Sequence, residues 1–563
     1  MLPLPPPVVE LVQLLPSLLA ERRDGLDLEI AGEPIRSPWR WQDGNPPRVW
    51  LPIDLLEQRF GIRHAPGPDG SLRLESYGWR QELPSASLTT LQDEVGIDAT
   101  DLLDRLGARV SRPWGPGGNG RLRIDWSPGL MTGLRRGPGP VPSRIVLDLA
   151  APTPISRSRL GVGGSETLRF RLQGADAAVA ALRQQGIRAG QEGDRLVVSL
   201  DGWQVLTLGD PARIVLDRDI SSSEPAPTTA VRGFGPSVLR RSLDLDGRTV
   251  RLTAVAFDPR RDPLRLVPLS RRSMEGLSSL TSLARSQGAV AALNGGFFNR
   301  IRALPLGGLK DQGDWLSGPS LGRGGMAWNP GELPRFGRMR LQEWLEDDQG
   351  RRWPLVVLNS GFIQQGLARY TALWGPAYRA ISGRESALML EGDRVVEVVD
   401  GERLAAGVPL GPGRQLIVGR GGVVLPHAVG DSLRLRRQAG PEGLEELPFL
   451  IQAGPLLLRQ GQVVLDGELE SFSAAFLNQR APRSVVASDG QRLWLLTLEG
   501  DQDPGPTLPE TVGLLRRLGM VDALNLDGGS STSLVVSGEE GSAGRGLGSS
   551  IHNGLGLVAP GPR

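Results

Sequence analysis

With 563 residues, 76 of them glycine and 46 proline, the chain has room for roughly three or four domains and favours many turns and short strands over long helices. Lys and Arg (64) nearly balance Asp and Glu (62), and the basic residues are scattered without a sustained run, which argues against a nucleic-acid-binding protein. The absence of cysteine excludes disulfides, thiolate metal sites and a cysteine nucleophile. We therefore expect a multidomain, β-rich α+β protein.

Residues 1–45 form a Pro-rich N-terminal segment before the first predicted domain. The apolar stretch 11–20 is too short to span a bilayer, is interrupted by Pro16 and has no basic residues before it. No signal peptide and no transmembrane segment are predicted from this pattern.

A small α+β domain is expected over residues 46–140. Residues 49–61 have the pattern of a strand that enters a short helix, which should end at Gly61, and residues 72–74 follow as a strand. This stretch resembles the small domain of cell-wall-associated bacterial proteins that is named after the N-terminal domain of copper amine oxidases. The resemblance covers about residues 46–126.

Residues 141–220 are predicted to form a small β-sandwich-like domain, because two copies of Arg-Ile-Val-Leu-Asp, at 144–148 and 213–217, enclose alternating apolar segments. Residues 144–152 are similar to the opening strand of the domains that attach bacterial envelope amidases to peptidoglycan. Ordinary strands with solvated Arg and Asp explain the pattern equally well. The resemblance implies peptidoglycan as a partner and a periplasmic or exported location, although no signal peptide is evident.

The next segment, residues 221–240, is rich in Ser, Pro and Thr and has the composition of a linker. After it, residues 241–563 are predicted to form one large domain with a mixed sheet and flanking helices. Helical spacing occurs at 277–287 and again at 508–518, which is followed by Gly519.

A buried strand is predicted at residues 289–293, and it ends on a polar, glycine-rich turn. A strand that ends in this way places an amide side chain and exposed backbone at a sheet edge or cleft. The residues of this turn are Asn294, Gly295, Gly296 and Phe297.

The most informative stretch is 522–536, which runs from an apolar segment through Asp527 into a β-branched segment. It predicts a strand, an exposed polar turn and a second strand. Glycines let a ligand approach main-chain N–H groups, and hydroxyls offer donors beside the carboxylate. The alternative is a plain hairpin whose aspartate caps its own turn, since Asp-Gly is also a strong hairpin signal. The turn residues after Asp527 are Gly528, Gly529, Ser530, Ser531 and Thr532.

Other polar points interrupt apolar runs in the same domain. Gly454-Pro455 precedes the run 456–458, and Pro482-Arg483-Ser484 precedes the strand 485–487. The strand 493–498 runs directly into Glu499. A mixed α/β arrangement of these strands would bring Glu499 and Asp527 to the same end of a sheet.

In this order, the motifs resemble those of the phosphodiester glycosidase family over roughly residues 240–560, which makes 241–563 the expected glycosidase domain. The resemblance implies hydrolysis of a sugar–phosphate diester, with a glycan or sugar phosphodiester as the substrate. The chain departs from the family at Ser530, where glycine is usual, and at Glu499-Gly500-Asp501, where Asp-Gly-Arg is frequent, so the substrate stays open. The matching motifs are Asn294-Gly295-Gly296-Phe297-Phe298, Gly454-Pro455, Pro482-Arg483-Ser484, and Asn525 to Thr532.

Cleavage of such a diester needs cations or N–H donors for the phosphate, and carboxylates that transfer protons or stabilise positive charge at the anomeric carbon. We therefore assign catalytic roles to Asp527, Glu499 and Arg483. Arg483 follows the fixed φ of Pro482 and suits bidentate phosphate recognition, although a solvated surface role is the more common one for arginine. The expected substrate-binding residues are Asn294, Gly295, Gly296, Phe297, Gly454, Ser484, Asn525, Gly528, Gly529, Ser530, Ser531, Thr532 and Asn553.

No motif specifies a metal, because the three histidines, His64, His427 and His552, lie far apart without ligand spacing. Asp-rich turns can bind calcium, so the cofactor requirement stays open. The alternative to a hydrolase is a non-catalytic envelope module that binds glycan through a degenerate form of the same cleft. Retention of both carboxylates and the arginine favours the enzyme.

Overall fold

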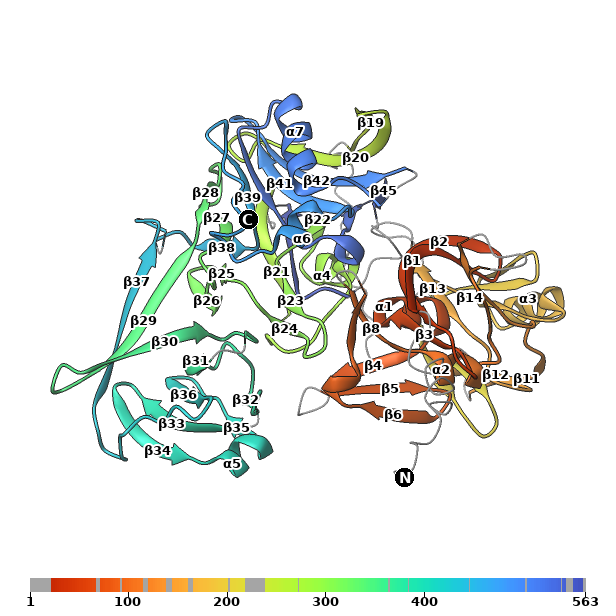
Figure 1. Cartoon of the computed structure of the whole chain (residues 1–563), viewed down its shortest axis with the longest axis horizontal. Coiled ribbons are helices and arrows are strands. Elements are labelled where there is room, and N and C mark those ends of the chain that lie inside the picture. The colour runs from red at the N-terminus through yellow and green to blue at the C-terminus, as the bar shows by residue number, and fades with distance from the viewer. Residues whose placement is uncertain are drawn as a thin grey trace, which may run out of the picture.

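The computed structural model is rich in strands and has three parts that are separated in Figure 1, which confirms the expected β-rich, multidomain architecture. The N-terminal body (22–217) lies on the right, the core (238–339 and 441–559) at the top and centre, and the inserted part (340–440) at the lower left. Among the residues that the structure describes, no helix is long and apolar enough to cross a membrane. The described residues are 22–66, 71–91, 94–114, 120–137, 144–159, 166–200, 203–217, 238–271, 273–362, 365–382, 384–444, 446–501, 504–537, 539–542 and 550–559.

The N-terminal body begins with a sheet ordered β7-β8-β3-β2-β1-β10-β9. A smaller sheet, β4-β5-β6, lies beside the helix α1, which ends at Gly61 as predicted, with φ at +70°. The elements are β1 (Arg22–Ile30), β2 (Glu33–Gln42), β3 (Arg48–Pro52), α1 (Ile53–Phe60), β4 (Arg63–Pro66), β5 (Leu72–Ser76), β6 (Trp79–Leu83), η1 (Ser85–Ser87), β7 (Thr89–Leu91), β8 (Glu94–Asp98), α2 (Thr100–Arg105), β9 (Arg109–Ser111) and β10 (Leu122–Asp125).

Residues 22–42 correct one expected boundary. The sequence placed them in a Pro-rich segment outside the first domain, but they form β1 and β2 in the middle of its sheet. Trp39 and Trp41 of β2 are buried. The register of the β1–β2 pair shifts between Gly25 and Asp27, and this bulge lies opposite Pro38, which has no N–H to donate to the ladder.

The second half of the N-terminal body contains the sheets β11-β12-β18-β17 and β13-β14-β16-β15. The two Arg-Ile-Val-Leu-Asp copies are neighbours, because β12 and β18 pair with Arg144 opposite Asp217. The elements are β11 (Met131–Arg136), β12 (Arg144–Leu149), β13 (Ser156–Arg159), β14 (Glu166–Arg171), α3 (Ala175–Gln184), β15 (Ala189–Glu192), β16 (Arg195–Ser199), β17 (Gln204–Leu208) and β18 (Arg213–Asp217).

One hydrophobic core joins both halves of this body, from Leu28 to Leu216. In addition β11, which falls within the expected 46–140 domain, pairs with β12 of the following sheet. Residues 22–217 are therefore packed as one body. The expected linker at 221–240 lies outside the described residues up to residue 237, and β19 starts at Val238.

The core contains the sheet that carries most of the sequence motifs, here named the β41 sheet, in the order β19-β20-β42-β41-β43-β39-β40. Because β41 is antiparallel to both β42 and β43, the latter two run in the same direction on either side of it. Its strands are β19 (Val238–Leu245), β20 (Arg248–Phe257), β39 (Leu456–Arg459), β40 (Gln462–Val463), β41 (Arg483–Ser488), β42 (Leu493–Gly500) and β43 (Asp522–Asn525).

The β22 sheet, ordered β21-β46-β22-β44-β45, and the β38 sheet, ordered β26-β25-β38-β27-β28, pack against the β41 sheet. Leu293, Ile451 and Val486 represent the three sheets in one buried cluster. The strands are β21 (Arg265–Ser270), β22 (Ala289–Asn294), β44 (Leu534–Val536), β45 (Glu539–Ser542), β46 (Asn553–Val558), β25 (Leu309–Asp311), β26 (Asp314–Ser317), β27 (Gly324–Trp328), β28 (Arg335–Arg338) and β38 (Phe449–Gln452).

Helices of the core follow their sequence signals. Helix α4 (Leu280–Ser286) begins after Ser279, whose Oγ accepts from Ser282 N. Helix α7 (Leu508–Arg517) has a capping box between Thr507 and Glu510, and it covers the outer face of the β41 sheet with Leu514 and Leu515. The predicted helices are confirmed, with shorter bounds than expected at the first.

The inserted part is built on the β36 sheet, ordered β34-β33-β36-β31-β30-β29-β37. Its strands are β29 (Arg340–Asp347), β30 (Arg352–Leu358), β31 (Gly366–Thr371), β33 (Glu385–Glu391), β34 (Arg394–Val399), β36 (Arg414–Arg420) and β37 (Leu433–Gly440). The remaining elements are β23 (Phe298–Asn299), β24 (Leu304–Pro305), β32 (Ala377–Tyr378), α5 (Gly401–Ala406), β35 (Val408–Pro409) and α6 (Ala474–Asn478).

Candidate active site

The stretch around Asp527 connects two sheets. Strand β43 lies in the β41 sheet and β44 lies in the β22 sheet, so the hairpin alternative is wrong. The turn holds a short 3-10 helix, Gly529–Ser531, that is buried, while Asp527 and Gly528 stay half-buried. The expected exposed turn is therefore mostly closed, because it lies at the seam between two packed sheets, and only Asp527 and Gly528 keep partial exposure.

Asn294, the last residue of β22, fixes the main chain of this turn. Its Nδ2 donates to the Asp527 carbonyl at 2.6 Å, and its Oδ1 accepts from Ser484 Oγ at 2.5 Å and from Ser533 N at 3.0 Å. Asp527 N in turn donates to the Gly295 carbonyl at 2.9 Å. Asn294 is fully buried, so its amide links β22, β41 and the Asp527 turn.

The Gly295-Gly296 turn is held by the last strand, β46. Asn553 Oδ1 accepts from Gly296 N at 2.8 Å, and a side chain on Gly295 would place its Cβ 2.2 Å from that oxygen. His552 Nε2 lies 2.9 Å from the Met274 carbonyl, so this nitrogen carries the proton. The other ring nitrogen accepts from Asn553 Nδ2 at 3.1 Å. His552 is thus a positioning residue that orients Asn553.

Burial keeps His552 uncharged. The ring is 1% exposed, and this loss of solvation lowers its pKa to about 4, although the hydrogen bond to Met274 opposes the shift. A neutral ring is the form that can accept from Asn553 at Nδ1. The histidine therefore supports the turn at neutral pH through one fixed tautomer.

Arg483 and Ser484 begin β41 next to the same turn. Arg483 is 2% exposed; its Nε donates to the Pro506 carbonyl at 3.1 Å and its Nη2 to the Gln479 carbonyl. A Cβ on Gly528 would lie 4.0 Å from Arg483 Nη1, so the guanidinium lies beside the turn. The structure thus gives Arg483 a buried place against Gly528, with two of its nitrogens bonded to backbone carbonyls.

Glu499 lies at the same end of the sheet, one strand away. It follows Leu498, which pairs with Arg483, and β41 separates it from β43 and Asp527. Its Oε2 is 3.8 Å from Arg251 Nη2 of β20, and its side chain is 16% exposed. The two expected carboxylates therefore share one end of the sheet, while Glu499 faces an arginine on the side away from β41.

Gly454 and Asn525 form a second contact behind the turn. Asn525 Nδ2 donates to the Gly454 carbonyl at 2.8 Å, and Gly454 N donates back to the Asn525 carbonyl at 3.0 Å. Gly454 has φ at +104°, and a Cβ there would lie 2.8 Å from Glu470 Oε2. The positive φ and the lack of room for a Cβ both explain why residue 454 is a glycine.

Two buried side-chain oxygens of the segment 525–532 have no hydrogen-bond partner within the described part of the chain. They are Asn525 Oδ1 and Thr532 Oγ1. In contrast, Ser530 and Ser531, between them in sequence, bond to groups outside the turn.

Phe297, the fourth residue of the Asn294 motif, packs with two other aromatic rings. Its ring lies 5.7 Å from that of Phe472 and 6.1 Å from that of Phe476. The Arg323 guanidinium lies 4.0 Å from the Phe472 ring centre, and Arg483 lies 5.8 Å from that of Phe476. These half-buried rings form an apolar wall between two arginines next to the Asp527 turn.

Arg300 is a site residue that the sequence analysis missed. Its Nη2 donates to Ser531 Oγ at 2.8 Å, and its Nη1 donates to Asp54 Oδ2 of helix α1. Burial lowers the pKa of the Arg300 guanidinium, and the nearby Asp527 carboxylate opposes that shift. Its position just after the Asn294 motif was an available signal. For Asp54, in another part of the chain, no sequence signal existed.

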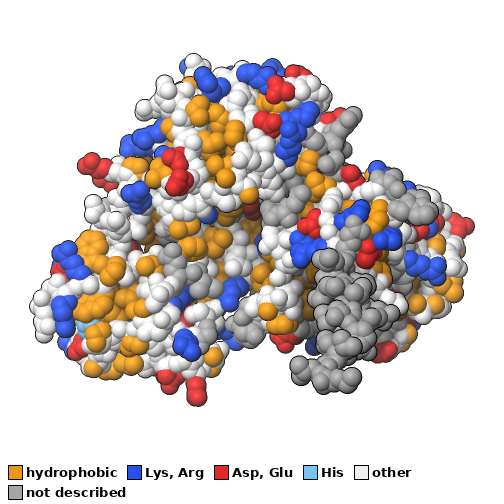
Figure 2. Space-filling model, in the orientation of Figure 1, with side chains coloured by type: hydrophobic (Ala, Val, Ile, Leu, Met, Phe, Trp, Pro, Cys, Tyr) orange, Lys and Arg blue, Asp and Glu red, His pale blue; other side chains and the backbone are white. Residues whose placement is uncertain are grey.

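Among the described residues, no group of three or more Asp, Glu or His side chains is arranged to hold a metal ion. On the face shown in Figure 2, basic side chains are interspersed with acidic ones. The described groups around the Asp527 turn are carboxylates, guanidiniums, hydroxyls and backbone N–H groups.

The chain is similar to solved structures over most of its length, and its C-terminal part matches a family model. A crystal structure of a hypothetical protein from Synechocystis is 28% identical, covers 96% of this chain and 99% of its own, and has a TM-score of 0.56. A protein of Burkholderia pseudomallei is 18% identical (76% of this chain, 97% of its own, TM-score 0.45). The catalytic domain of zebrafish N-acetylglucosamine-1-phosphodiester alpha-N-acetylglucosaminidase is 15% identical (57% and 83%, TM-score 0.29).

No curated protein matches the chain. The family comparison concerns the segment that contains β33 to β46, and so includes Glu499, Arg483, Asp527 and Asn553 but neither Asn294 nor Arg300. Those last two residues belong to the same site through the pairing of β22 with β44 and β46. The site is thus built around a segment, residues 382–558, that matches the phosphodiester glycosidase family.

Proposed function

We propose that the chain is a hydrolase that cleaves the bond between a sugar and the phosphate of a phosphodiester, on a glycan of the cell envelope or an exported glycan. The observation that supports the proposal is that segments far apart in the sequence hold the turn that carries the half-buried Asp527. Asn294 and Gly295 hold the main chain of Asp527, and Ser484 holds Asn294. The family match of residues 382–558 supports the same class of reaction.

Asp527 is proposed to act at the anomeric carbon. Positive charge develops there as the bond to phosphate breaks, and a fixed carboxylate stabilises that charge or transfers a proton. The phosphate that leaves is already an anion, so neighbouring positive charge assists its departure more than an acid does. Arg483 beside Gly528 and Arg300 beside Ser531 place that charge on two sides of the turn.

Glu499 is proposed as the second carboxylate. Its place at the end of β42 supports this role, and its Oε2 lies 3.8 Å from Arg251 Nη2. Glu499→Gln should therefore lower turnover less than loss of Asp527, which lies directly on the turn. A variant with unchanged turnover would remove Glu499 from the mechanism.

The decisive assay is release of free sugar from a panel of sugar 1-phosphodiesters. We expect Asp527→Asn to fold and bind as the wild type does but to turn over roughly 100-fold more slowly or worse, as loss of a positioned acid or base does. Asp522→Asn, at the opposite end of β43, is the matched control and should keep its turnover. Arg483→Ala should weaken cleavage of phosphodiesters more than that of a simple aryl glycoside, which has no phosphate.

The same assay distinguishes the hydrolase from the glycan-binding alternative. If the wild type releases no sugar from any diester, yet binds glycan equally well with and without Asp527→Asn, the hydrolase proposal fails and a binding module remains.

The envelope context is a separate proposal, supported by the resemblance of residues 46–126 and 144–152 to small wall-associated domains. It predicts that the full chain sediments with isolated peptidoglycan and is found in the periplasmic or exported fraction of its source cells. Sedimentation no greater than that of an unrelated protein of similar charge would remove peptidoglycan as a partner.

A further inference from the structure

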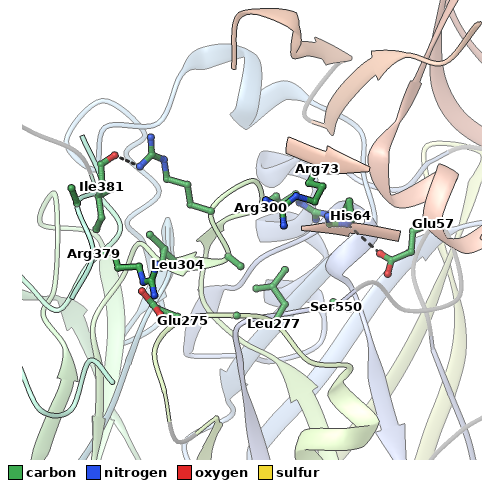
Figure 3. Close-up of a pocket in the computed structure, with 14 residues that line it drawn as sticks. Glu57, His64, Arg73, Glu275, Leu277, Arg300, Leu304, Arg379, Ile381 and Ser550 are labelled. Atoms are coloured by element: carbon green, nitrogen blue, oxygen red, sulfur yellow. Dashed lines mark hydrogen bonds and ion pairs between the residues drawn. The ribbon is translucent and has the colours of Figure 1, made fainter. Parts of the chain in front are cut away.

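A cavity of about 680 Å³ opens where the three parts of the chain meet (Figure 3). Its volume is within the range of sites that enclose a small ligand. Arg300, which contacts the Asp527 turn through Ser531, is one of its walls. Its charged lining comes from the N-terminal body (Glu57, His64 and Arg73), the core (Glu275, Arg300 and Arg302) and the inserted part (Arg379).

The lining carries more positive than negative charge. Its described residues include four arginines against two glutamates. In Figure 3 the Glu275 and Arg379 side chains lie together on one side, while Arg73, His64 and Arg300 gather on the other. Glu57 lies next to His64 on that second side. Burial raises the pKa of Glu57, but the hydrogen bond and charge of His64 together with the charge of Arg157 lower it by more, so the net shift is downward. Glu57 is already paired with His64, and the guanidiniums of Arg73 and Arg300 are the groups on that side that can bind an anion.

Asp54 of the N-terminal body places a carboxylate against Arg300 and Ser530. Its Oδ2 accepts from Arg300 Nη1 and, at 3.2 Å, from Ser530 Oγ. The same arginine donates to Ser531 Oγ through its other terminal nitrogen. Carboxylate and phosphate oxygens use the same guanidinium and hydroxyl donors. The Asp54 carboxylate therefore engages, next to the Asp527 turn, the same kinds of donor that a phosphate oxygen uses.

We infer that the cavity is the subsite for the phosphate-bearing half of the substrate, that Arg300 contacts the phosphate, and that Asp54 competes with it for Arg300. This inference rests on the proposed function and adds a subsite to it. The N-terminal body then sets the substrate affinity of the core, because it supplies both a wall of the cavity and the competing carboxylate.

The test measures binding of phenyl phosphate to the full chain by titration calorimetry, with benzyl alcohol as the uncharged control ligand. Asp54→Asn removes the competing carboxylate. Phenyl phosphate binding should become about 10-fold tighter, because Arg300 is no longer paired with Asp54 in most molecules. Asp101→Asn is the matched control: it removes an acidic residue from the first turn of helix α2 in the same body, and it should leave the affinity unchanged.

Arg300→Gln should weaken phenyl phosphate binding by about 10-fold or more, and combining it with Asp54→Asn should not restore the affinity. Arg265→Gln, an exposed arginine on β21, should bind as the wild type does. Because removal of Arg300 leaves Asp54 without its cation, thermal melts check folding, and Arg300→Lys keeps the charge if the glutamine variant unfolds. Arg300→Lys should bind more weakly than the wild type, since lysine lacks the guanidinium fork.

Two outcomes would overturn the inference. Equal affinity of the wild type and Asp54→Asn would remove the competition, and equal affinity of a folded Arg300 variant and the wild type would remove the subsite. Neither result depends on turnover, so a chain that binds phenyl phosphate as predicted but releases no sugar would overturn the proposed function alone.

Discussion

The inserted part and the Asp527 turn both bury charged groups, but their partners come from different places. In the inserted part, Arg420 is 1% exposed and bonds to Glu385 at 3.1 Å and to the hydroxyls of Tyr370 and Tyr378. All of these residues belong to the inserted part itself. At the Asp527 turn, the partners come from β22, β41 and helix α1 of another part.

This difference separates a closed structural network from the network of the candidate site. Glu385 has no exposed side-chain surface and its oxygens accept from Arg420, Tyr378 and Ser382, so the network is closed to solvent. Asp527 remains half-buried, and the guanidinium beside it is bonded to a carboxylate that belongs to another part of the chain. Burial of a charged side chain is therefore a weak sign of function. A better sign is a charged group that stays partly accessible and has partners from different parts of the chain.

The largest effect on stability is expected for Arg420→Gln. It leaves Glu385 as a buried charge without its cation, which should lower the free energy of unfolding by about 3 to 5 kcal/mol. Turnover per folded molecule should stay at the wild-type value. Urea unfolding and the sugar-release assay measure the two quantities, and Arg414→Gln, an exposed residue at the start of the same strand, is the control. A loss of turnover without a loss of stability would show that the Arg420–Glu385 network serves more than folding.

Asn294→Ala should affect both stability and turnover. It leaves the Asp527 carbonyl, Ser533 N and Ser484 Oγ without their amide partner, and we expect a loss of about 3 kcal/mol in unfolding free energy. Turnover should fall as well, because the Asp527 main chain is no longer fixed. Asn329→Ala, in a surface turn, is the control. Unchanged turnover in a destabilised Asn294→Ala would show that the amide serves folding only.

His552 should make stability depend on pH. Its folded pKa of about 4 lies below the value of about 6.5 for an unfolded histidine, so the unfolded chain binds a proton first. The associated stability is fully present above pH 6.5 and is lost as pH falls toward 4, by up to about 3 kcal/mol. Unfolding free energies measured across this range should show a shallower slope in His552→Gln.

The matched variant for this experiment is His64→Gln. His64 pairs with Glu57 at 3.2 Å outside the Asp527 turn, so its removal should retain the slope that His552 produces. Identical pH profiles for the wild type and His552→Gln would contradict the neutral, buried assignment.

The smallest effect is expected for Ser484→Ala. It removes one of the hydrogen bonds of Asn294, so the loss should be about 1 kcal/mol, with a minor change in turnover. Ser488→Ala at the other end of β41 removes a bond to Gly490 N and should cost a similar amount without any change in turnover. A larger catalytic loss for Ser484→Ala than for Asn294→Ala would reverse the roles given to these two side chains.

Local features of the sequence predicted several elements of the core. Strand β22 follows from a continuous apolar run before Asn294, and α7 follows from helical spacing that is followed by Gly519. Strands β1 and β2 were missed, because Pro34 and Pro38 interrupt the alternating pattern and only the bulge in the sheet accommodates the second of them.

The sequence by itself determined which segments end in polar turns, because a strand end and a glycine-rich turn depend on neighbouring residues. Together with the resemblance to the phosphodiester glycosidase family, these turns made Asn294, Arg483, Asp527 and Asn553 candidates for one site. Only the tertiary structure decided how they meet: the Asn294–Asp527 bond joins residues 233 positions apart, and the Arg300–Asp54 pair joins residues 246 positions apart. Such contacts depend on how sheets pair and pack across the whole molecule, and no local pattern encodes the identity of a distant partner.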